Sequence, residues 1–194
     1  MRNEAIYRGD AGENTGLTIR VKTNNTVLPI SVSEFKTYAK VDTSADDTLI
    51  ESMIRSVKDS GENTTRLTWF TKTLVAEWES HGQSVDLPVG PHLSIVKVEQ
   101  YEDGVYNTLT TDDYTVTGED FKTLHFNDWG YGLRVEFTAG YGASASNLPD
   151  DLKLGVYKAT LSAYEDRQNL AEGSFTEMPG GTKKFFAGRR RILI

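Results

Sequence analysis

The chain has 194 residues, with 28 acidic and 21 basic side chains and no cysteine. That length fits one domain, or one domain with an insert and tails. The lack of cysteine excludes disulfides, thiol nucleophiles and cysteine-based zinc sites. No segment approaches the roughly 18 apolar residues of a membrane span, and residues 1–10 have no signal-peptide apolar region, so we expect a soluble protein made in a cytoplasm.

The net charge of −7 is unevenly distributed along the chain. Residues 182–194 contain five basic side chains and no acidic one, which leaves 16 basic and 28 acidic side chains, a balance of −12, in residues 1–181. An acidic body therefore carries a basic tail. A reversal of sign confined to one terminus is typical of a segment that binds something outside its own domain.

The N-terminal residues 1–27 are polar and rich in Asn, Thr and Gly. They contain one alternating stretch, residues 17–21, which predicts a strand. We interpret this region as an extended arm whose strand pairs only in an assembly.

Two helices are predicted in residues 28–64. The first covers residues 34–40, with Ser33 as its cap, and the second covers residues 45–61, with Ser44 as its cap. The second helix has a broad apolar stripe. Its members are Leu49, Ile50, Met53, Ile54 and Val57.

From residue 65 to residue 143 the hydrophobic period changes to two, which predicts short antiparallel strands. The pair Asp103-Gly104 between two alternating stretches is a two-residue hairpin signal. The predicted strands cover residues 68–75, 84–87, 94–101, 105–109, 114–116, 123–126 and 133–137.

A third helix is predicted over residues 149–168, with Asn147 as its cap. It is apolar on more than one side, which indicates a helix between two surfaces. The sequence thus predicts an α+β fold in which a small helical bundle carries an antiparallel β insert. The expected parts are an N-terminal arm (1–27), a helical core (28–64 plus 148–170), the β insert (65–147) and a basic C-terminal tail (171–194).

The search for catalytic chemistry is negative. No nucleophile elbow, P-loop or dinucleotide motif is present, and none of the histidines has a partner at metal-ligand spacing. His125 is interpreted as a half-buried strand residue. Two of the three acidic pairs fall at predicted helix starts, where a favourable interaction with the helix dipole explains them. We expect no enzyme, no cofactor and no metal. The histidines are His81, His92 and His125, and the acidic pairs are Asp46-Asp47, Asp112-Asp113 and Asp150-Asp151.

Aromatic side chains in the strand-rich region leave a carbohydrate-binding module as an alternative of another class. Aromatic residues in strands more often belong to a core or an interface. The aromatic residues in question are Trp69, Trp78, Tyr101, Tyr106, Trp129 and Tyr131.

Several short segments carry a family resemblance through their order and spacing. They are Leu28-Pro29-Ile30-Ser31, Glu34-Phe35-Lys36, Val41-Asp42, Asp46-Asp47-Thr48-Leu49-Ile50, Asp113-Tyr114-Thr115-Val116, Val135-Glu136-Phe137-Thr138-Ala139-Gly140-Tyr141-Gly142, Leu148-Pro149-Asp150-Asp151-Leu152 and Tyr164-Glu165-Asp166-Arg167. Over residues 28–170 this pattern resembles the head–tail connector proteins, also called adaptor or head-completion proteins, of long-tailed phages and gene-transfer particles.

The resemblance implies a structural virion protein without catalytic activity. Such proteins form a homo-oligomeric ring, typically a dodecamer, beneath the portal protein at the capsid vertex. The ring extends the DNA channel and joins the capsid to the next neck or tail component, and the C-terminal segment commonly reaches the portal. We therefore expect localisation to the virion neck, assembly in the host cytoplasm, passage of DNA without specific recognition, and no membrane contact.

Charge adds two expectations to this resemblance. An acidic channel lining repels phosphates, so DNA can slide through it. The basic tail combines arginine forks, which suit carboxylates, with aromatic and β-branched residues, which suit a groove or an added strand. Our hypothesis is that residues 182–194 dock on the portal; a disordered tail and a DNA contact are the alternatives. The candidate docking residues are Lys183, Lys184, Phe185, Phe186, Arg189, Arg190, Arg191, Ile192, Leu193 and Ile194.

Two alternatives to a connector stay open: another kind of virion protein, and the carbohydrate-binding module described above. Among virion proteins, the alternative is a tail-side completion or stopper protein. A connector is expected to form rings or bind a portal, whereas a sugar-binding module is expected to stay monomeric and to be retained on a polysaccharide column.

Overall fold

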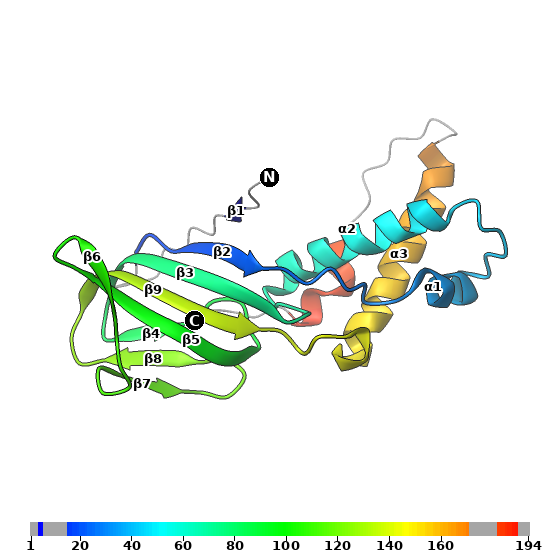
Figure 1. The fold of residues 1–194 in the computed structure, drawn as a ribbon. Helices are drawn as coiled ribbons and strands as arrows, with labels where there is room; N and C mark the ends of the chain where they lie inside the picture. Colours follow the sequence, from blue (N-terminus) through cyan, green and yellow to red (C-terminus); the bar gives the residue numbers. More distant parts are fainter. Residues whose placement is uncertain (1–3, 6–14, 171–181, 190–194) are drawn as a thin grey trace. The chain divides into compact units, whose positions relative to one another are not determined.

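The computed structural model describes residues 4–5, 15–170 and 182–189 (Figure 1). Three α-helices and two antiparallel sheets occur in these residues, so the predicted α+β class is confirmed. The chain divides into two compact units. Residues 1–25 and 71–140 form the β unit, and residues 26–70 and 141–194 form the helical unit. Among the described helices, none is long and apolar enough to cross a membrane.

The β unit contains a six-stranded and a three-stranded sheet, and neighbouring strands in both are antiparallel. The larger sheet has the order β1 (Glu4–Ala5), β2 (Thr18–Thr23), β3 (Lys72–His81), β9 (Gly130–Ala139), β5 (His92–Glu102) and β6 (Val105–Thr108). The smaller sheet has the order β4 (Ser84–Asp86), β8 (Thr123–Phe126) and β7 (Tyr114–Thr117).

The core of the β unit consists of buried apolar side chains from both sheets. Along β9, alternate residues are buried, as a strand with one covered face requires. The β5–β6 turn is the predicted hairpin, because Asp103 and Gly104 both have positive φ, 50° and 87°, as a type I′ turn demands. The main core side chains are Leu74, Ala76, Trp78, Val85, Leu87, Leu124, Leu133, Val135 and Phe137.

The strand near the N-terminus corrects one expectation. The prediction that it pairs only in an assembly is wrong, because β2 pairs with β3 of the same chain, with Ile19 opposite Ala76. The physical reason is that Ile19 is buried in the core of the β unit. Its apolar side chain binds the strand to its own sheet.

The helical unit is built on α1 (Val32–Ala39), α2 (Asp47–Thr65) and α3 (Asp150–Leu170). Helices α2 and α3 share one hydrophobic core. The largest buried side chains of this core include Phe35, Ile50, Ile54, Leu152 and Val156.

The segment after α2 differs from its prediction as a strand over residues 68–75. The strand begins only at Lys72, while Trp69 and Phe70 are fully buried in the helical core. Trp69 is fixed by two bonds to α2: its backbone N–H donates to Glu62 Oε1 at 2.8 Å, and its indole N–H donates to Thr65 Oγ1 at 3.3 Å. These contacts outweigh the local strand pattern.

The helix caps also differ from prediction. Ser31, not Ser33, caps α1: the Glu34 N–H donates to Ser31 Oγ at 3.1 Å, and the Ser31 N–H donates to Glu34 Oε2 at 2.6 Å, a reciprocal capping box. The cap residue of α2 is Asp46, not Ser44, and it makes no side-chain cap bond. That helix runs beyond Gly61 to Thr65, and α3 begins one residue after the predicted Pro149.

Candidate assembly surfaces

The net charge of the chain lies on one unit. The β unit contains 15 acidic and 8 basic side chains, whereas the helical unit contains 13 of each. The β unit therefore accounts for the whole balance of −7. Within it, residues 98–131 alone have eight acidic side chains and one basic one. Without residues 182–194, the helical unit still has 13 acidic and 8 basic side chains, so the acidic body of residues 1–181 includes both units, and the basic tail neutralises the excess of the helical unit.

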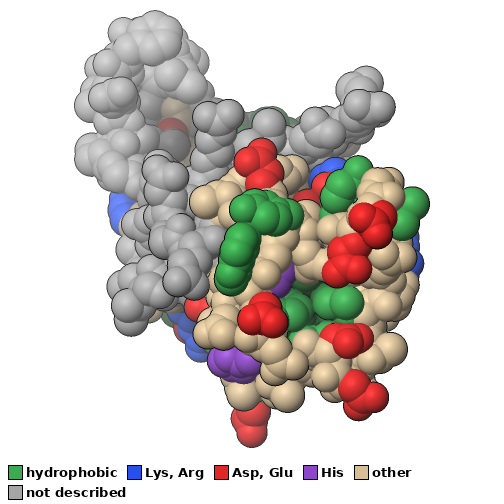
Figure 2. Space-filling view, turned by 90° about the vertical axis from the view of Figure 1, so that its left-hand side faces the viewer, with side chains coloured by type: hydrophobic (Ala, Val, Ile, Leu, Met, Phe, Trp, Pro, Cys, Tyr) green, Lys and Arg blue, Asp and Glu red, His purple; other side chains and the backbone are tan. Residues whose placement is uncertain are grey.

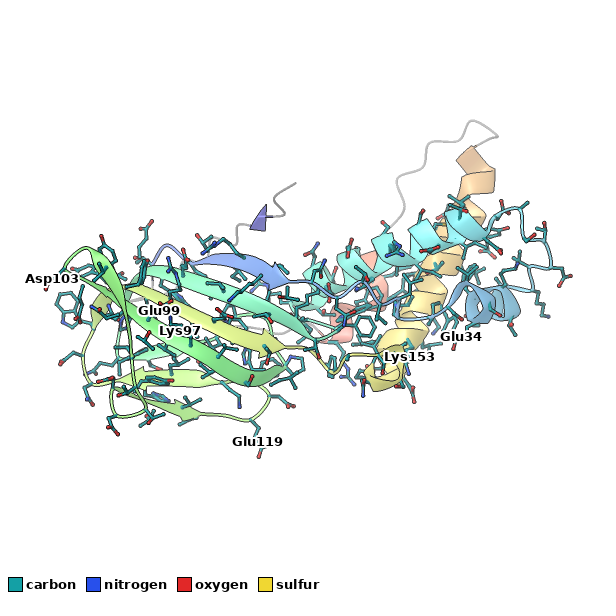
Figure 3. All side chains as sticks on the ribbon, in the orientation of Figure 1. Glu34, Lys97, Glu99, Asp103, Glu119 and Lys153 are labelled. Atoms are coloured by element: carbon teal, nitrogen blue, oxygen red, sulfur yellow. The ribbon has the colours of Figure 1, made fainter. Side chains whose placement is uncertain are left out.

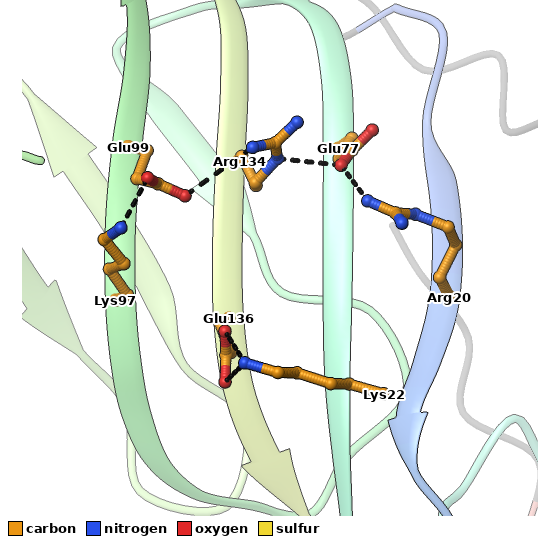
Figure 4. A network of polar contacts seen from close by, with 7 residues as sticks. All are labelled: Arg20, Lys22, Glu77, Lys97, Glu99, Arg134 and Glu136. Carbon is orange, nitrogen blue, oxygen red and sulfur yellow. Dashed lines mark hydrogen bonds and ion pairs between the residues drawn. The ribbon is translucent and has the colours of Figure 1, made fainter. Parts of the chain in front are cut away.

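The six-stranded sheet presents a network of ion pairs on the face that points away from the core (Figure 4). Arg134 lies at its centre, with its Nε 2.8 Å from Glu77 Oε1 and its Nη1 3.8 Å from Glu99 Oε2. Lys97 pairs with Glu99 at 2.6 Å and Arg20 pairs with Glu77. Close by, Lys22 Nζ lies 2.7 Å from Glu136 Oε1. With four cations and three carboxylates, this face is not the source of the acidic excess.

Arg134 also stacks on an aromatic ring. Its guanidinium carbon lies 3.7 Å from the centroid of Tyr106, within the range of a cation–π contact. The same side chain thus combines a flat aromatic partner with carboxylates on two neighbouring strands.

Two aromatic side chains, Trp129 and Tyr131, are exposed at the start of β9, and we call them the aromatic surface. Trp129 and Tyr131 contact each other edge to face, with ring centroids 5.4 Å apart. They line a cavity of about 440 Å³ together with Ser80, His81 and Gln83. Figure 2, which views this end, shows hydrophobic side chains among acidic ones, with basic side chains only toward the borders.

Two of the aromatic residues in the carbohydrate alternative are not available for binding. Trp69 is fully buried in the helical unit, and Trp78 is buried in the β unit. Each packs among the apolar side chains of its own unit's hydrophobic core.

The described part of the C-terminal tail is folded onto the helical unit. Residues 182–189 form the short helices η2 (Thr182–Phe185) and η3 (Ala187–Arg189). Phe186 is 1% exposed, and Phe185 is partly buried against the same core. Lys184 is exposed, with its ammonium 4.9 Å from the Phe185 ring.

Arg189 ties this segment to the first turn of α3. Its Nε donates to Asp151 Oδ2 at 2.5 Å. Burial opposes the charged guanidinium, but hydrogen bonding to Asp151 and Tyr141 exceeds that effect and raises the pKa of Arg189 above its ordinary value. Asp151 therefore acts in a specific contact as well as in the helix dipole.

The candidate docking residues are thus divided. Phe186 is buried in the core of its own chain, and Arg189 is paired with Asp151. The side chain of Lys183 and residues 190–194 lie outside the described residues. Docking on a portal stays a prediction. The sequence alone could not separate anchoring residues from docking residues, because aromatic and basic side chains suit both roles.

The histidines take structural positions. His81 is buried and its Nε2 lies 2.9 Å from Gln100 Oε1. His92 is buried, and its Nδ1 accepts from the Lys122 backbone N–H at 2.9 Å. His125 is a half-buried residue of β8, as predicted, with Nε2 2.8 Å from Thr117 Oγ1. In the part of the chain that the structure describes, no three His, Cys, Asp or Glu side chains gather as a metal site.

Comparison with known proteins gives structural likeness only. No protein-family model matches the chain, and no curated protein matches it. A chain in a structure described as the neck of an empty gene transfer agent (GTA) particle computed with C6 symmetry is similar over 91% of this chain and 96% of its own, at 20% identity and a TM-score of 0.69. A chain in the virion of the native GTA particle is similar at 21% identity, with the same coverage and TM-score.

A chain in the neck of the native GTA particle, computed with C12 symmetry, is similar at 20% identity and a TM-score of 0.65. The alignment covers 93% of this chain and 97% of that chain. At these identities the comparisons define a shared fold, and they do so over nearly the full length of both chains.

Proposed function

We propose that this protein is a structural component of a phage-like virion neck. The observation that supports this most directly is the likeness of fold over 91% of this chain and 96% of a chain from the neck of a GTA particle. Because almost all of both chains is aligned, the likeness includes the β unit and the helical unit together.

Within the neck, we propose the role of a head–tail adaptor that forms a closed ring and extends the DNA channel from the portal to the next component. Two of the neck structures were computed with C6 and C12 symmetry, which supports a ring and is compatible with twelve copies. A ring requires each copy to offer two different surfaces to its neighbours.

The helical unit has exposed apolar side chains suited to copy–copy contacts. Tyr38 of α1, Leu49 of α2 and Leu154 of α3 are each at least 40% exposed. Leu154 lies on the opposite side of α3 from buried Leu152 and Val156, in keeping with the prediction that this helix is apolar on more than one side. We assign these residues to the ring interface.

DNA passes through this ring without specific recognition in our proposal. The excess of acidic side chains on the β unit repels phosphates, so it favours sliding over binding. Portal docking is assigned to the end of the basic tail. Because Phe186 and Arg189 make contacts within the helical unit, the docking part consists of residues 190–194.

The docking proposal is tested by deleting residues 190–194 and measuring attachment to portal-bearing capsids. We expect attachment to fall at least tenfold while the free energy of unfolding is unchanged. Undiminished attachment would overturn docking by this segment, but it would not contradict the proposal that the protein forms a ring. A larger deletion of residues 182–194 is unsuitable, because removal of Phe186 disrupts the helical core.

A further inference from the structure

The aromatic surface exposes more apolar area than folding of the β unit requires. Trp129 is 66% exposed and Tyr131 is 61% exposed. Exposed aromatic side chains gathered at one place mark an interaction site more often than scattered ones do. The adjoining cavity of about 440 Å³ adds a concave element to this surface.

The backbone that carries these rings is held from below. At Gly130, between the two aromatic residues, a Cβ would lie 2.7 Å from both Gln100 Nε2 and His81 Nε2. Gln100 Nε2 donates to the carbonyl of Tyr131, and His81 Nε2 is 2.9 Å from Gln100 Oε1. A buried polar pair thus fixes the start of β9, which contains Tyr131 and directly follows Trp129.

A second glycine, Gly132, directly follows Tyr131 in β9. Gly132 has φ +64°, and a Cβ there would lie 2.4 Å from Tyr101 Cβ. Only a glycine permits this close approach of β9 to the Tyr101 side chain. Tyr131 therefore lies between two closely packed glycines, and this defined backbone position suits a preformed binding surface.

Unpaired carboxylates accompany the rings. Glu102 and Asp103 lie at the β5–β6 hairpin, and Asp128 directly precedes Trp129. All three are exposed, and among the described residues no side chain pairs with them. Figure 3 places Asp103 at the tip of the hairpin, and Figure 2 shows acidic side chains among the hydrophobic ones. A ligand for this surface must be cationic and must offer a flat or apolar face.

The β unit already holds one side chain of that kind. Arg134 stacks at 3.7 Å on Tyr106 while it pairs with Glu77 and lies near Glu99. Guanidinium groups stack on aromatic faces and bind carboxylates through a planar fork, and an ammonium group does neither as well. The acidic charge disfavours nucleic acid.

We propose that the aromatic surface binds arginine side chains of a second neck protein, with the guanidinium groups stacked on Trp129 and Tyr131 and paired with Glu102, Asp103 or Asp128. The identity of the partner as a neck protein rests on the proposed function. The chemistry of recognition rests on the surface alone. Rim carboxylates add on-rate and orientation, while the stacked rings supply most of the affinity.

The test titrates the full chain with an acetylated, amidated Gly-Arg-Arg-Arg-Gly peptide and follows Trp fluorescence and binding heat. The matched probe replaces each arginine with lysine. We expect the arginine peptide to bind at least fivefold more tightly than the lysine peptide, and its affinity to fall as salt rises. Equal binding of both peptides, or no binding of either, would overturn the proposal.

Two variants localise the binding. Trp129→Ala is expected to lower the affinity for the arginine peptide at least tenfold, whereas Leu93→Ala, which removes an exposed apolar side chain near the start of β5, leaves that affinity unchanged. Equal affinity of Trp129→Ala and the unaltered chain contradicts the proposed surface. The near-UV circular dichroism of each variant confirms that it is folded.

Two other occupants are distinguished in the same assay. A chain lacking residues 190–194 is expected to bind the peptide as the full chain does; a marked gain in affinity would mean that the surface is filled by the tail of another copy, and would overturn the proposal. Tight binding of cellohexaose at Trp129 would overturn it in favour of a sugar ligand. Ring formation, measured separately by native mass spectrometry, fails or succeeds independently of these results.

Discussion

The ring of Phe186 meets the indole of Trp69 edge-on, with ring centroids 5.2 Å apart and an interplanar angle of 60°. Trp69 follows α2, whereas Phe186 lies in the C-terminal segment. Their contact therefore joins two distant parts of the chain within the core of the helical unit. Gly61 and Gly155 provide the space for it, because a Cβ at Gly61 would lie 2.3 Å from Trp69 Cη2 and one at Gly155 would lie 2.6 Å from Phe186 Cε1.

Removal of the Phe186 ring is expected to destabilise the helical unit strongly. Phe186→Ala leaves a cavity beside Trp69, and losses of this kind amount to about 3–5 kcal/mol in the free energy of unfolding. Urea unfolding monitored by Trp fluorescence measures the change. Lys184→Ala is the control, since that side chain is exposed, and it is expected to change stability by less than about 0.5 kcal/mol. A Phe186→Ala protein as stable as the control would contradict the core position of this ring.

Gly61 is expected to resist substitution despite its position in a helix. Alanine normally stabilises a helix interior by about 1 kcal/mol relative to glycine. Here the added methyl group overlaps Trp69, and overpacking costs about 1–3 kcal/mol, so Gly61→Ala is expected to lower the thermal midpoint. Ser56→Ala, on an exposed position of α2, is the matched helix control. A raised midpoint for Gly61→Ala would show that the close approach is absent.

The capping box of α1 predicts a pH-dependent contribution to stability. The backbone N–H and hydroxyl of Ser31 hold the pKa of Glu34 below its ordinary value of 4.5. Since the folded pKa is lowered, the stabilisation is complete above the unfolded pKa and is lost as pH falls through the folded pKa. The difference in unfolding free energy between the unaltered chain and Glu34→Gln is therefore expected to be constant above about pH 6 and to shrink below pH 4.5.

Chemical denaturation of both proteins at pH 7 and pH 3 measures this difference. Ser31→Ala, which removes the reciprocal bond, is expected to cost about 1 kcal/mol at pH 7. A Glu34→Gln difference of the same size at both pH values would contradict the assigned pKa shift.

The network around Arg134 predicts that arginine cannot be replaced by lysine at this position. Arg134→Lys keeps the charge but loses the Nε hydrogen bond to Glu77 and the stacking on Tyr106, so a loss of about 1 kcal/mol in the free energy of unfolding is expected. Lys97→Ala, at the exposed end of the network, is expected to cost less than about 0.5 kcal/mol. The thermal midpoints of both variants give the comparison, and equal losses would show that stacking contributes nothing.

Local patterns predicted the elements whose stabilisation is local. The helix around Ile50 and Ile54, the hairpin at Asp103-Gly104 and the helix after Pro149 all follow from periodicity and turn chemistry. Trp69 and Phe70 were misassigned because their alternation matches a strand, and only packing against α2 and α3 places them in the helical core. The same limit applied to Ser33 and Ser31, where the bond to Glu34 decides the cap.

The candidate surfaces were less accessible to sequence reasoning. The basic residues of the tail marked a functional segment, but the burial of Phe186 depends on space left by Gly61 and Gly155 on other elements. The aromatic surface also required the structure. Trp129 and Tyr131 lie at the same end of the sheet as the β5–β6 hairpin because β9 pairs with β5, and the sequence does not specify that neighbour.

The charge pattern that separates an acidic body from a basic tail is sharpened by the two units. The whole net charge of −7 belongs to the β unit, while the tail contributes to neutralising the helical unit. Arg189 of the tail, for example, forms an ion pair with Asp151 of α3. The distribution of charge thus describes two units with different surfaces.

The central claim is that this chain forms a ring in a virion neck, and a cryo-electron microscopy reconstruction of the neck in particles that contain it tests this most directly. We expect density for a closed ring of identical copies around the DNA channel, next to the portal, into which the β unit and the helical unit fit as separate bodies. Density for this chain outside the neck, or as isolated copies that do not surround the channel, would contradict the account.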